Sequence, residues 1–161
     1  MGVEEEIMED LIKRLEEYKE DIIEMKRPKE RRIFVRVRAD GFKKFLSRLI
    51  EDLELRHLST ITGVDLGQEM ELLYHFSYKY SVEISIGVKV PKSAPKVPTI
   101  TDLIPGAIFY EQEVHDLLGI EFEGHPNMGP LIIPEGWPEG VYPLRKEHTV
   151  QELNRIARGG R

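Results

Sequence analysis

The sequence contains no cysteine among its 161 residues. This absence excludes disulfide bonds, thiolate zinc sites, cysteine nucleophiles and cysteine-ligated iron–sulfur clusters from the chain itself. The sequence also lacks a run of roughly 20 apolar residues, so no segment is predicted to span a membrane. Its first residues, Met1 to Glu6, lack the basic and then apolar order of a signal peptide, which predicts a cytoplasmic location.

Several catalytic motifs are missing as well. There is no G-x-G-x-x-G after a strand-like segment, no phosphate-binding P-loop and no G-x-S-x-G nucleophile elbow. The net charge of -6 argues against bulk binding of nucleic acid. With 40% hydrophobic and 32% charged residues, the chain is predicted to be globular and long enough for one domain with its own core.

The first third of the chain predicts two amphipathic helices and a strand. Residues 4–26 form the first helix, which Pro28 is expected to end. Residues 32–38 alternate apolar with basic side chains, as a half-buried strand does. Residues 41–53 form the second helix, with a broader apolar face. The stripe that predicts the first helix consists of Ile7, Leu11, Leu15, Tyr18, Ile22 and Met25.

Three strands are predicted after the second helix. Residues 55–64 form the first, which ends in a turn near Gly63 to Gly67. Residues 70–80 and 82–90 carry apolar side chains at every even position, so one face of this pair is buried. The tight connection at Tyr80–Ser81 predicts an antiparallel hairpin. The order of elements predicts an α+β fold, with helices packed on one face of a mainly antiparallel sheet, followed by an extended irregular C-terminal tail.

The sequence predicts three parts. A sheet domain of residues 1–98 ends in a stiff proline-rich connector. Residues 99–119 form a helix packed on that domain, with Gly119 as its C-cap. Residues 120–161 are rich in glycine and proline and carry apolar side chains without a core of their own. We therefore expect an extended tail that wraps a partner and ends in a short helix, with Trp137 either anchoring that partner or plugging the tail locally.

Acids and histidines crowd the stretch from Phe109 to Pro126. On a helix Glu111 and His115 share one face, and His125 follows in the next turn of chain, so a metal or acid–base site can be drawn from these three side chains. A small stand-alone metal-dependent hydrolase is therefore one hypothesis. The spacing lacks H-E-x-x-H, and ion pairs or hydrogen bonds that anchor loops explain the same residues more simply.

A basic cluster lies beside the strand predicted at 32–38. Basic side chains around an exposed Phe34, with Arg36 in the same strand, could bind RNA, so an RNA-binding α+β module is a second alternative. A solvated face, or a face that pairs with an acidic partner, is the simpler explanation. The cluster consists of Lys26, Arg27, Lys29, Arg31 and Arg32.

The stretch from Thr101 to Pro126 is similar to a known signature. It reads Thr-Asp-Leu-Ile-Pro-Gly-Ala-Ile-Phe-Tyr-Glu-Gln-Glu-Val-His-Asp-Leu-Leu-Gly-Ile-Glu-Phe-Glu-Gly-His-Pro, and Pro143-Leu-Arg-Lys-Glu147 follows it. Both resemble the C subunit, the thirty-kilodalton subunit, of respiratory complex I, over about residues 30–148. Departures such as Gln112 in place of an arginine resemble the archaeal relatives in membrane-bound energy-converting nickel–iron hydrogenases and related sulfur-reducing complexes.

This resemblance implies a non-catalytic, cofactor-free subunit in the peripheral arm of a complex I-related membrane oxidoreductase. Its partners would be a hydrogenase-like large subunit, an iron–sulfur small subunit and other subunits of the complex. Those neighbours would hold the iron–sulfur clusters and, in a hydrogenase, the nickel–iron centre. The chain would lie on the cytoplasmic side of the cell membrane without spanning it, and would bind no nucleic acid.

The same resemblance suggests which residues form interfaces or support the local structure, and it assigns no catalytic, cofactor-binding or metal-binding residue. Glu113 and Asp116 are expected to pair with arginines of a partner or with Arg145. The full expected set is Glu111, Glu113, Asp116, Gly119, Gly124, His125, Pro126, Trp137, Pro143, Leu144, Arg145 and Lys146.

Overall fold

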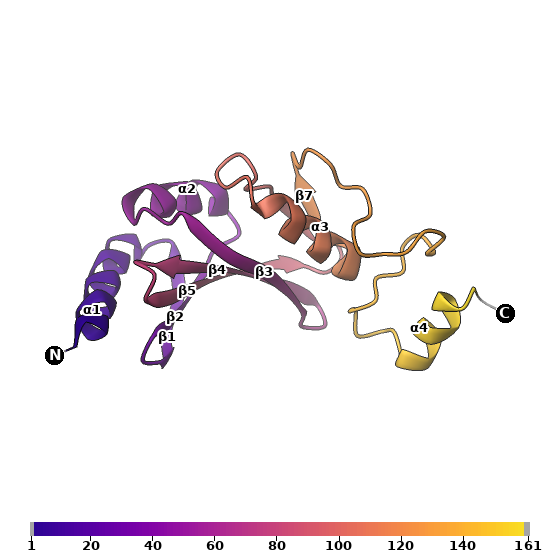
Figure 1. Cartoon of the computed structure of the whole chain (residues 1–161), viewed down its shortest axis with the longest axis horizontal. Helices are drawn as coiled ribbons and strands as arrows, with labels where there is room; N and C mark the ends of the chain where they lie inside the picture. Colours follow the sequence, from indigo (N-terminus) through magenta and orange to yellow (C-terminus); the bar gives the residue numbers. More distant parts are fainter. Residues whose placement is uncertain (1, 160–161) are drawn as a thin grey trace. The chain divides into compact units, whose positions relative to one another are not determined.

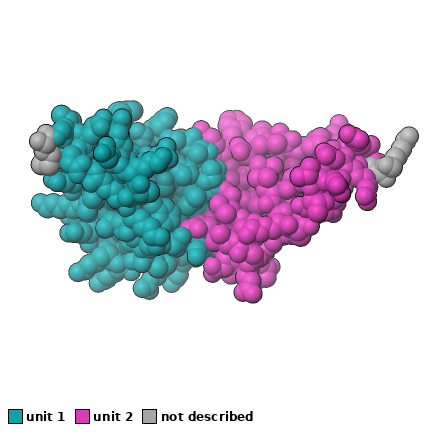
Figure 2. All heavy atoms as spheres, turned by 90° about the horizontal axis from the view of Figure 1, so that it is seen from below, with its two compact units in different colours: residues 1–62, 72–89 teal, residues 63–71, 90–161 magenta. Residues whose placement is uncertain are grey.

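A five-stranded sheet in the order β1-β2-β5-β4-β3 is the largest element of the structure (Figure 1). The structure is a computed structural model and describes residues 2–159. Contacts divide the chain into two units, residues 1–62 with 72–89 and residues 63–71 with 90–161 (Figure 2). The strands of the sheet are β1 (Ile22–Lys29), β2 (Arg32–Val37), β3 (His57–Asp65), β4 (Glu69–Tyr78) and β5 (Val82–Pro91).

The sheet is mainly antiparallel, as predicted, with one parallel pair. Strands β1 and β2 are antiparallel, with Met25 opposite Val35. Strands β2 and β5 are parallel, and their register ends with Val37 opposite Val88. Short connections join β3 to β4 and β4 to β5, so these hydrogen-bonded neighbours run in opposite directions.

Two helices of the first unit cover one face of the sheet. They are α1 (Val3–Leu15) and α2 (Phe42–Asp52). The ring of Phe42 lies 5.1 Å from that of Tyr74, and the hydroxyl of Tyr78 donates to Asp10 of α1 at 2.7 Å. Tyr74 and Tyr78 occupy even positions of β4, so the helices cover the face that was predicted to be buried. The helices bury Met8, Leu11, Leu15, Phe42, Phe45, Leu46, Leu49 and Ile50.

The N-terminal helix is shorter than predicted. Helix α1 ends at Leu15, the short 3-10 helix η1 (Glu16–Tyr18) follows, and residues 22–29 form strand β1 at the edge of the sheet. Ile22 and Met25 therefore continue the helical spacing of apolar residues without being helical. Pro28 lies inside this strand rather than ending a helix. An edge strand tolerates proline because one of its sides has no neighbour to receive an amide hydrogen bond.

The hairpin between β4 and β5 turns at Lys79 and Tyr80. Both residues have positive φ, 47° and 54°, and the amide of Ser81 donates to the carbonyl of Tyr78 at 3.1 Å. Positive φ at both central positions is the signature of a type I′ turn. Tyr80 is 87% exposed, so the buried even positions end at Tyr78 rather than Tyr80. Strand β3 also continues through Asp65, where a turn was predicted.

The second unit is built around a helix and a small parallel sheet. It contains α3 (Ala107–Leu118), the paired strands β6 (Lys96–Pro98) and β7 (Glu121–Glu123), and α4 (Val150–Ala157). The proline-rich connector thus leads into a short strand, and α3 forms the crossover between β6 and β7. Residues 124–149 form no helix or strand, and Thr149 caps α4 as part of the short helix that was predicted.

Helix α3 packs closely on a glycine of the same unit. A Cβ atom added to Gly63 would lie 2.3 Å from Cδ1 of Leu118 and 3.3 Å from Cγ1 of Val114. The glycine therefore allows the buried side of the helix to approach the backbone of β3. Between residues 2 and 159, no helix is long and apolar enough to cross a membrane.

Candidate functional site

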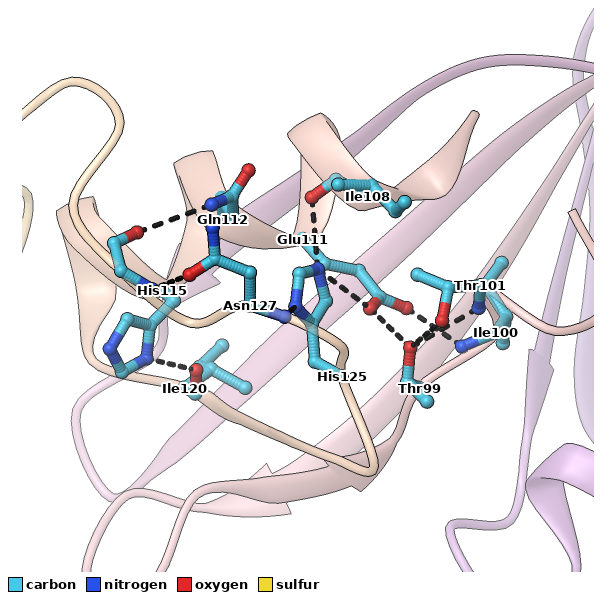
Figure 3. A network of polar contacts seen from close by, with 11 residues as sticks. Thr99, Ile100, Thr101, Ile108, Glu111, Gln112, His115, Ile120, His125 and Asn127 are labelled. Atoms are coloured by element: carbon cyan, nitrogen blue, oxygen red, sulfur yellow. Dashed lines mark hydrogen bonds and ion pairs between the residues drawn. The ribbon is translucent and has the colours of Figure 1, made fainter. Parts of the chain in front are cut away.

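A buried carboxylate on α3 holds the segment that leads into the helix. Glu111 is 0% exposed; its Oε1 accepts from the amide of Ile100 at 2.8 Å and its Oε2 from the hydroxyl of Thr99 at 2.6 Å (Figure 3). Thr99 Oγ1 accepts in turn from the amide of Thr101 at 3.2 Å. A buried charge is tolerated only when such bonds replace its hydration. Glu111 therefore anchors residues 99–101 to α3.

His125 uses both ring nitrogens in backbone hydrogen bonds. Its Nε2 lies 3.1 Å from the carbonyl oxygen of Ile108, and its Nδ1 lies 2.9 Å from the amide nitrogen of Asn127 (Figure 3). Nε2 must donate and Nδ1 must accept, which assigns a neutral Nε2–H tautomer. Glu111 Oε2 is 3.7 Å from Nε2, and both side chains are fully buried. His125 has no lone pair left for a metal ion; it fixes the turn that follows β7.

His115 does not join Glu111 and His125 in one site. Its Nδ1 lies 2.9 Å from the carbonyl oxygen of Ile120 (Figure 3). Its ring meets the edge of the Tyr142 ring, with the centroids 6.4 Å apart. No three His, Asp or Glu side chains within residues 2–159 are grouped so that they could hold a metal ion. The site drawn from the sequence is therefore not assembled.

Asp116 holds the chain after β7 through three consecutive amides. The residue is 3% exposed, and its Oδ2 lies 2.8 Å from the amide nitrogen of Leu131, 2.7 Å from that of Ile132 and 3.3 Å from that of Ile133. One turn earlier on the helix, Gln112 donates to the carbonyl of Gly129 at 3.3 Å. We call these four hydrogen bonds, from Gln112 and Asp116 to residues 129–133, the α3 clamp.

The second motif is also fastened to α3. Arg145 Nε donates to the carbonyl of Leu118 at 2.8 Å, and its guanidinium lies 4.7 Å from the centre of the Tyr142 ring. The amide of Leu144 donates to another carbonyl near the end of the helix, while its side chain is 57% exposed. Asp116 and Arg145 bond to backbone groups rather than to each other, and pairing of Glu113 or Asp116 with arginines of a partner stays a prediction.

Gly119 ends α3, as predicted, and its lack of a side chain leaves space for the ring of Tyr142 in the tail. Its φ is 74°, in the left-handed region that glycine adopts most readily, and its amide donates to the carbonyl of His115 at 2.8 Å. A Cβ atom at this position would lie 2.4 Å from Cε2 of Tyr142. Gly124 has a φ of 84° in the turn after β7. The first of these glycines therefore joins the helix end to the segment that carries the second motif.

The other predicted residues are less engaged. Glu113 is half-buried on α3, Pro126 is exposed and Pro143 is half-buried. Trp137 donates from Nε1 to the carbonyl of Val141 at 2.8 Å, which closes its own loop. The backbone amide of Lys146 donates to Asp65, and its side chain is exposed.

Sequence reasoning missed Asp65, which the structure places at a junction of the second unit. Its side chain is 2% exposed; Oδ2 lies 2.7 Å from Lys92 Nζ and 2.9 Å from the amide of Lys146, and Oδ1 accepts from the amide of Gly67 at 2.9 Å. Burial alone would raise the pKa of Asp65. The hydrogen bonds from Lys92, Lys146 and Gly67 outweigh that effect and lower the pKa to about 2. The spacing of Asp65 and Gly67 signals the turn, whereas nothing local signals the distant partners.

Most residues of the basic cluster beside β1 and β2 form ion pairs inside the first unit. Arg27 donates to both oxygens of Glu5, at 2.9 and 2.7 Å. Arg36 pairs with Glu24 and lies 5.1 Å from the centre of the Phe34 ring. Glu4 and Glu5 of α1 pair with Arg31 and Arg27 of the cluster, so part of the surface that the RNA-binding hypothesis requires is used in ion pairs within the chain.

Comparison with known proteins decides the family. Residues 35–154 match the family described as "Respiratory-chain NADH dehydrogenase, 30 Kd subunit". The chain belongs to this family. The 30 kDa subunit family was the one that the two motifs resembled, so that prediction is confirmed.

Two of the similar proteins are archaeal. The chain is 33% identical to the C subunit of the F(420)H(2) dehydrogenase of Methanosarcina mazei, over 71% of this chain and 76% of that protein. It is 33% identical to the beta subunit of the membrane-bound hydrogenase of Pyrococcus furiosus, over 72% of this chain and 69% of that protein. These similarities agree with the archaeal branch expected from the departures in the signature.

Two solved structures share the fold. A chain in the membrane-bound sulfane sulfur reductase, an archaeal respiratory membrane complex, has a TM-score of 0.81 and 30% identity, and covers 92% of this chain and 89% of its own length. The trypsin-resistant fragment 1–134 of Nqo5 has a TM-score of 0.63 and 25% identity, and covers 75% of this chain and 98% of its own length. Membership of the 30 kDa subunit family overturns both alternatives, the stand-alone hydrolase and the RNA-binding module.

Proposed function

We propose that this chain is a non-catalytic subunit of a membrane-bound oxidoreductase complex related to respiratory complex I, and that it assembles and stabilises its neighbours. One observation carries the proposal. Three signature residues that could act as acids, bases or ligands, Glu111, Asp116 and His125, are bonded to the backbone of their own chain. These buried residues hold the local backbone in place, and they are not free to react.

The proposed partners are a hydrogenase-like large subunit and an iron–sulfur small subunit. Electrons would pass through iron–sulfur clusters, and in a hydrogenase a nickel–iron centre, that those neighbours hold. The absence of cysteine supports this division, because cysteine thiolates are the usual ligands of such clusters. We place the chain on the cytoplasmic side of the membrane, attached through the complex.

The tail supports a role in assembly. The relative that was solved inside a membrane complex covers 92% of this chain, whereas the trypsin-resistant fragment of another relative covers 75%. Coverage of nearly the whole chain by a protein solved among its neighbours fits a tail that lies on a partner.

The test is purification of the tagged chain from detergent-solubilised membranes of its own source. We expect a large and a small subunit at stoichiometric amounts, with iron in the complex and none in the separated chain. Trypsin should cut the tail in the separated chain and leave it intact in the complex. A chain that purifies from membranes without any stoichiometric partner would overturn the proposal.

A further inference from the structure

Leu131 and Ile132 are fixed in their backbone but exposed in their side chains. The α3 clamp binds the amides of both residues, yet they are 45% and 49% exposed. Fixing each residue costs about 1–2 kcal/mol in backbone entropy, and the buried carboxylate of Asp116 has lost its water. This order adds little to the core of the unit, so the clamp keeps two apolar side chains in a defined position at the surface.

Phe109 is a further exposed apolar side chain on α3, and two prolines stiffen the clamped segment. Phe109 lies seven residues before Asp116, on the same side of α3, and is 63% exposed. Pro130 and Pro134 flank the clamped amides and restrict the backbone on both sides. A surface that is already ordered loses little further entropy on binding.

We propose that Phe109, Leu131 and Ile132 form a docking ridge that inserts into an apolar groove on a neighbouring subunit of the complex, with Asp116 as its positioning residue. This inference rests on the proposed function. A chain solved within an archaeal respiratory membrane complex covers 92% of this one, which supports a protein neighbour in such a complex.

The acids around the ridge indicate the chemistry of that groove. Glu113 is half-buried one turn after Phe109 on α3, and exposed Glu135 follows Pro134. Two acids disfavour an anionic lipid surface, and they would face their own copies across a homodimer contact. They suit an apolar groove with arginine or lysine at its rim, which is the usual arrangement of a protein interface.

The first test exchanges the exposed side chains. The full-length double variant Leu131→Ser/Ile132→Ser is expressed with the subunits of its complex and compared with Val150→Ser, which removes another exposed apolar side chain of the same unit. We expect both isolated variants to unfold at the temperature of the unchanged chain. The double variant should retain the partner at least about tenfold more weakly, and Val150→Ser should retain it normally.

The second test separates positioning from folding. Hydrogen exchange at the amides of residues 131–133 should be fastest in Asp116→Ala and intermediate in Asp116→Asn, and loss of partner should follow the same order. In the Leu131→Ser/Ile132→Ser background, Asp116→Ala should weaken binding little further, because the ridge it positions is already gone.

Three outcomes would overturn the ridge. They are normal partner recovery by the double variant, a full additional loss from Asp116→Ala in its background, and a change of self-association in place of partner binding. If the unchanged chain recovers no partner, the proposed function itself fails. If the unchanged chain and the double variant recover the partner equally, only the ridge fails.

Discussion

Lys92 Nζ lies 2.7 Å from Asp65 Oδ2, and this ion pair joins the end of β3 to the second motif, because Lys92 also pairs with Glu147 at 2.7 Å. Asp65→Asn should lower the free energy of unfolding by roughly 1.5–3 kcal/mol, since the amide replaces a charged acceptor of three hydrogen bonds. Chemical denaturation of the two proteins measures the difference.

The same residue predicts a dependence of stability on pH. The pKa of Asp65 is about 2 in the folded chain, below its ordinary 3.8. The stabilisation is therefore present above about pH 4 and is lost as the pH falls toward 2. Asp65→Asn should remove this part of the acid dependence; an unchanged acid profile in the variant would contradict the prediction.

Gly119→Ala should destabilise the second unit for two reasons. An alanine in the left-handed region costs roughly 1–2 kcal/mol, and the ring of Tyr142 must also move away from the new Cβ. Gly136→Ala is the matched control, because Gly136 has a φ of 82° and no atom within 4 Å of the added Cβ. Thermal unfolding should show a larger loss for Gly119→Ala; equal losses would mean that the contact with Tyr142 contributes nothing.

Tyr80→Gly should raise the stability of the first unit by up to about 1 kcal/mol. Tyr80 has a φ of 54° in the hairpin turn and is 87% exposed, so glycine relieves strain and removes little packing. Ser81→Gly is the control, because Ser81 does not have positive φ and should only lose stability. Equilibrium denaturation distinguishes the two, and a destabilised Tyr80→Gly would show that the tyrosine makes a contact worth more than the strain.

Glu111→Ala should cost about 3 kcal/mol, because it leaves the buried amide of Ile100 and hydroxyl of Thr99 without their acceptor. Glu111→Gln should cost less, since an amide oxygen can still accept one of the two bonds. Glu113→Ala, on the half-buried side of the same helix, should change stability by roughly 0.5 kcal/mol or less. Similar losses for the two alanine variants would argue against the anchoring role of Glu111.

Local patterns predicted much of the fold, and long-range pairing accounts for the errors. Alternating residues identified β4 and β5, and their buried face, because a half-buried strand shows its environment in every second residue. Strand β1 was missed because Ile22 and Met25 keep a helical spacing. Pairing of Met25 with Val35 then determines the conformation, and one-dimensional periodicity does not contain that information.

In the candidate site, too, local sequence predicted some features and did not predict the long-range contacts. The helix end at Gly119 followed from residue type and order, and the resemblance to the family pointed to Glu111 and Asp116. Their bonding partners did not, because an acid that will bind three amides has the same local sequence as an acid that will meet an arginine. Asp65 was missed for the same reason, since its contact with Lys146 spans 81 residues of chain.

The parallel pairing of β2 with β5 also bears on how the chain is made. Helix α2 and strands β3 and β4 lie between β2 and β5 in the sequence. The ribosome therefore synthesises these three elements before β5 can pair with β2. During that interval the hairpin of β1 and β2 has an open inner edge, and such edges recruit other chains. This open edge therefore favours aggregation until β5 has been synthesised. Expression that slows translation in that interval should increase the insoluble fraction.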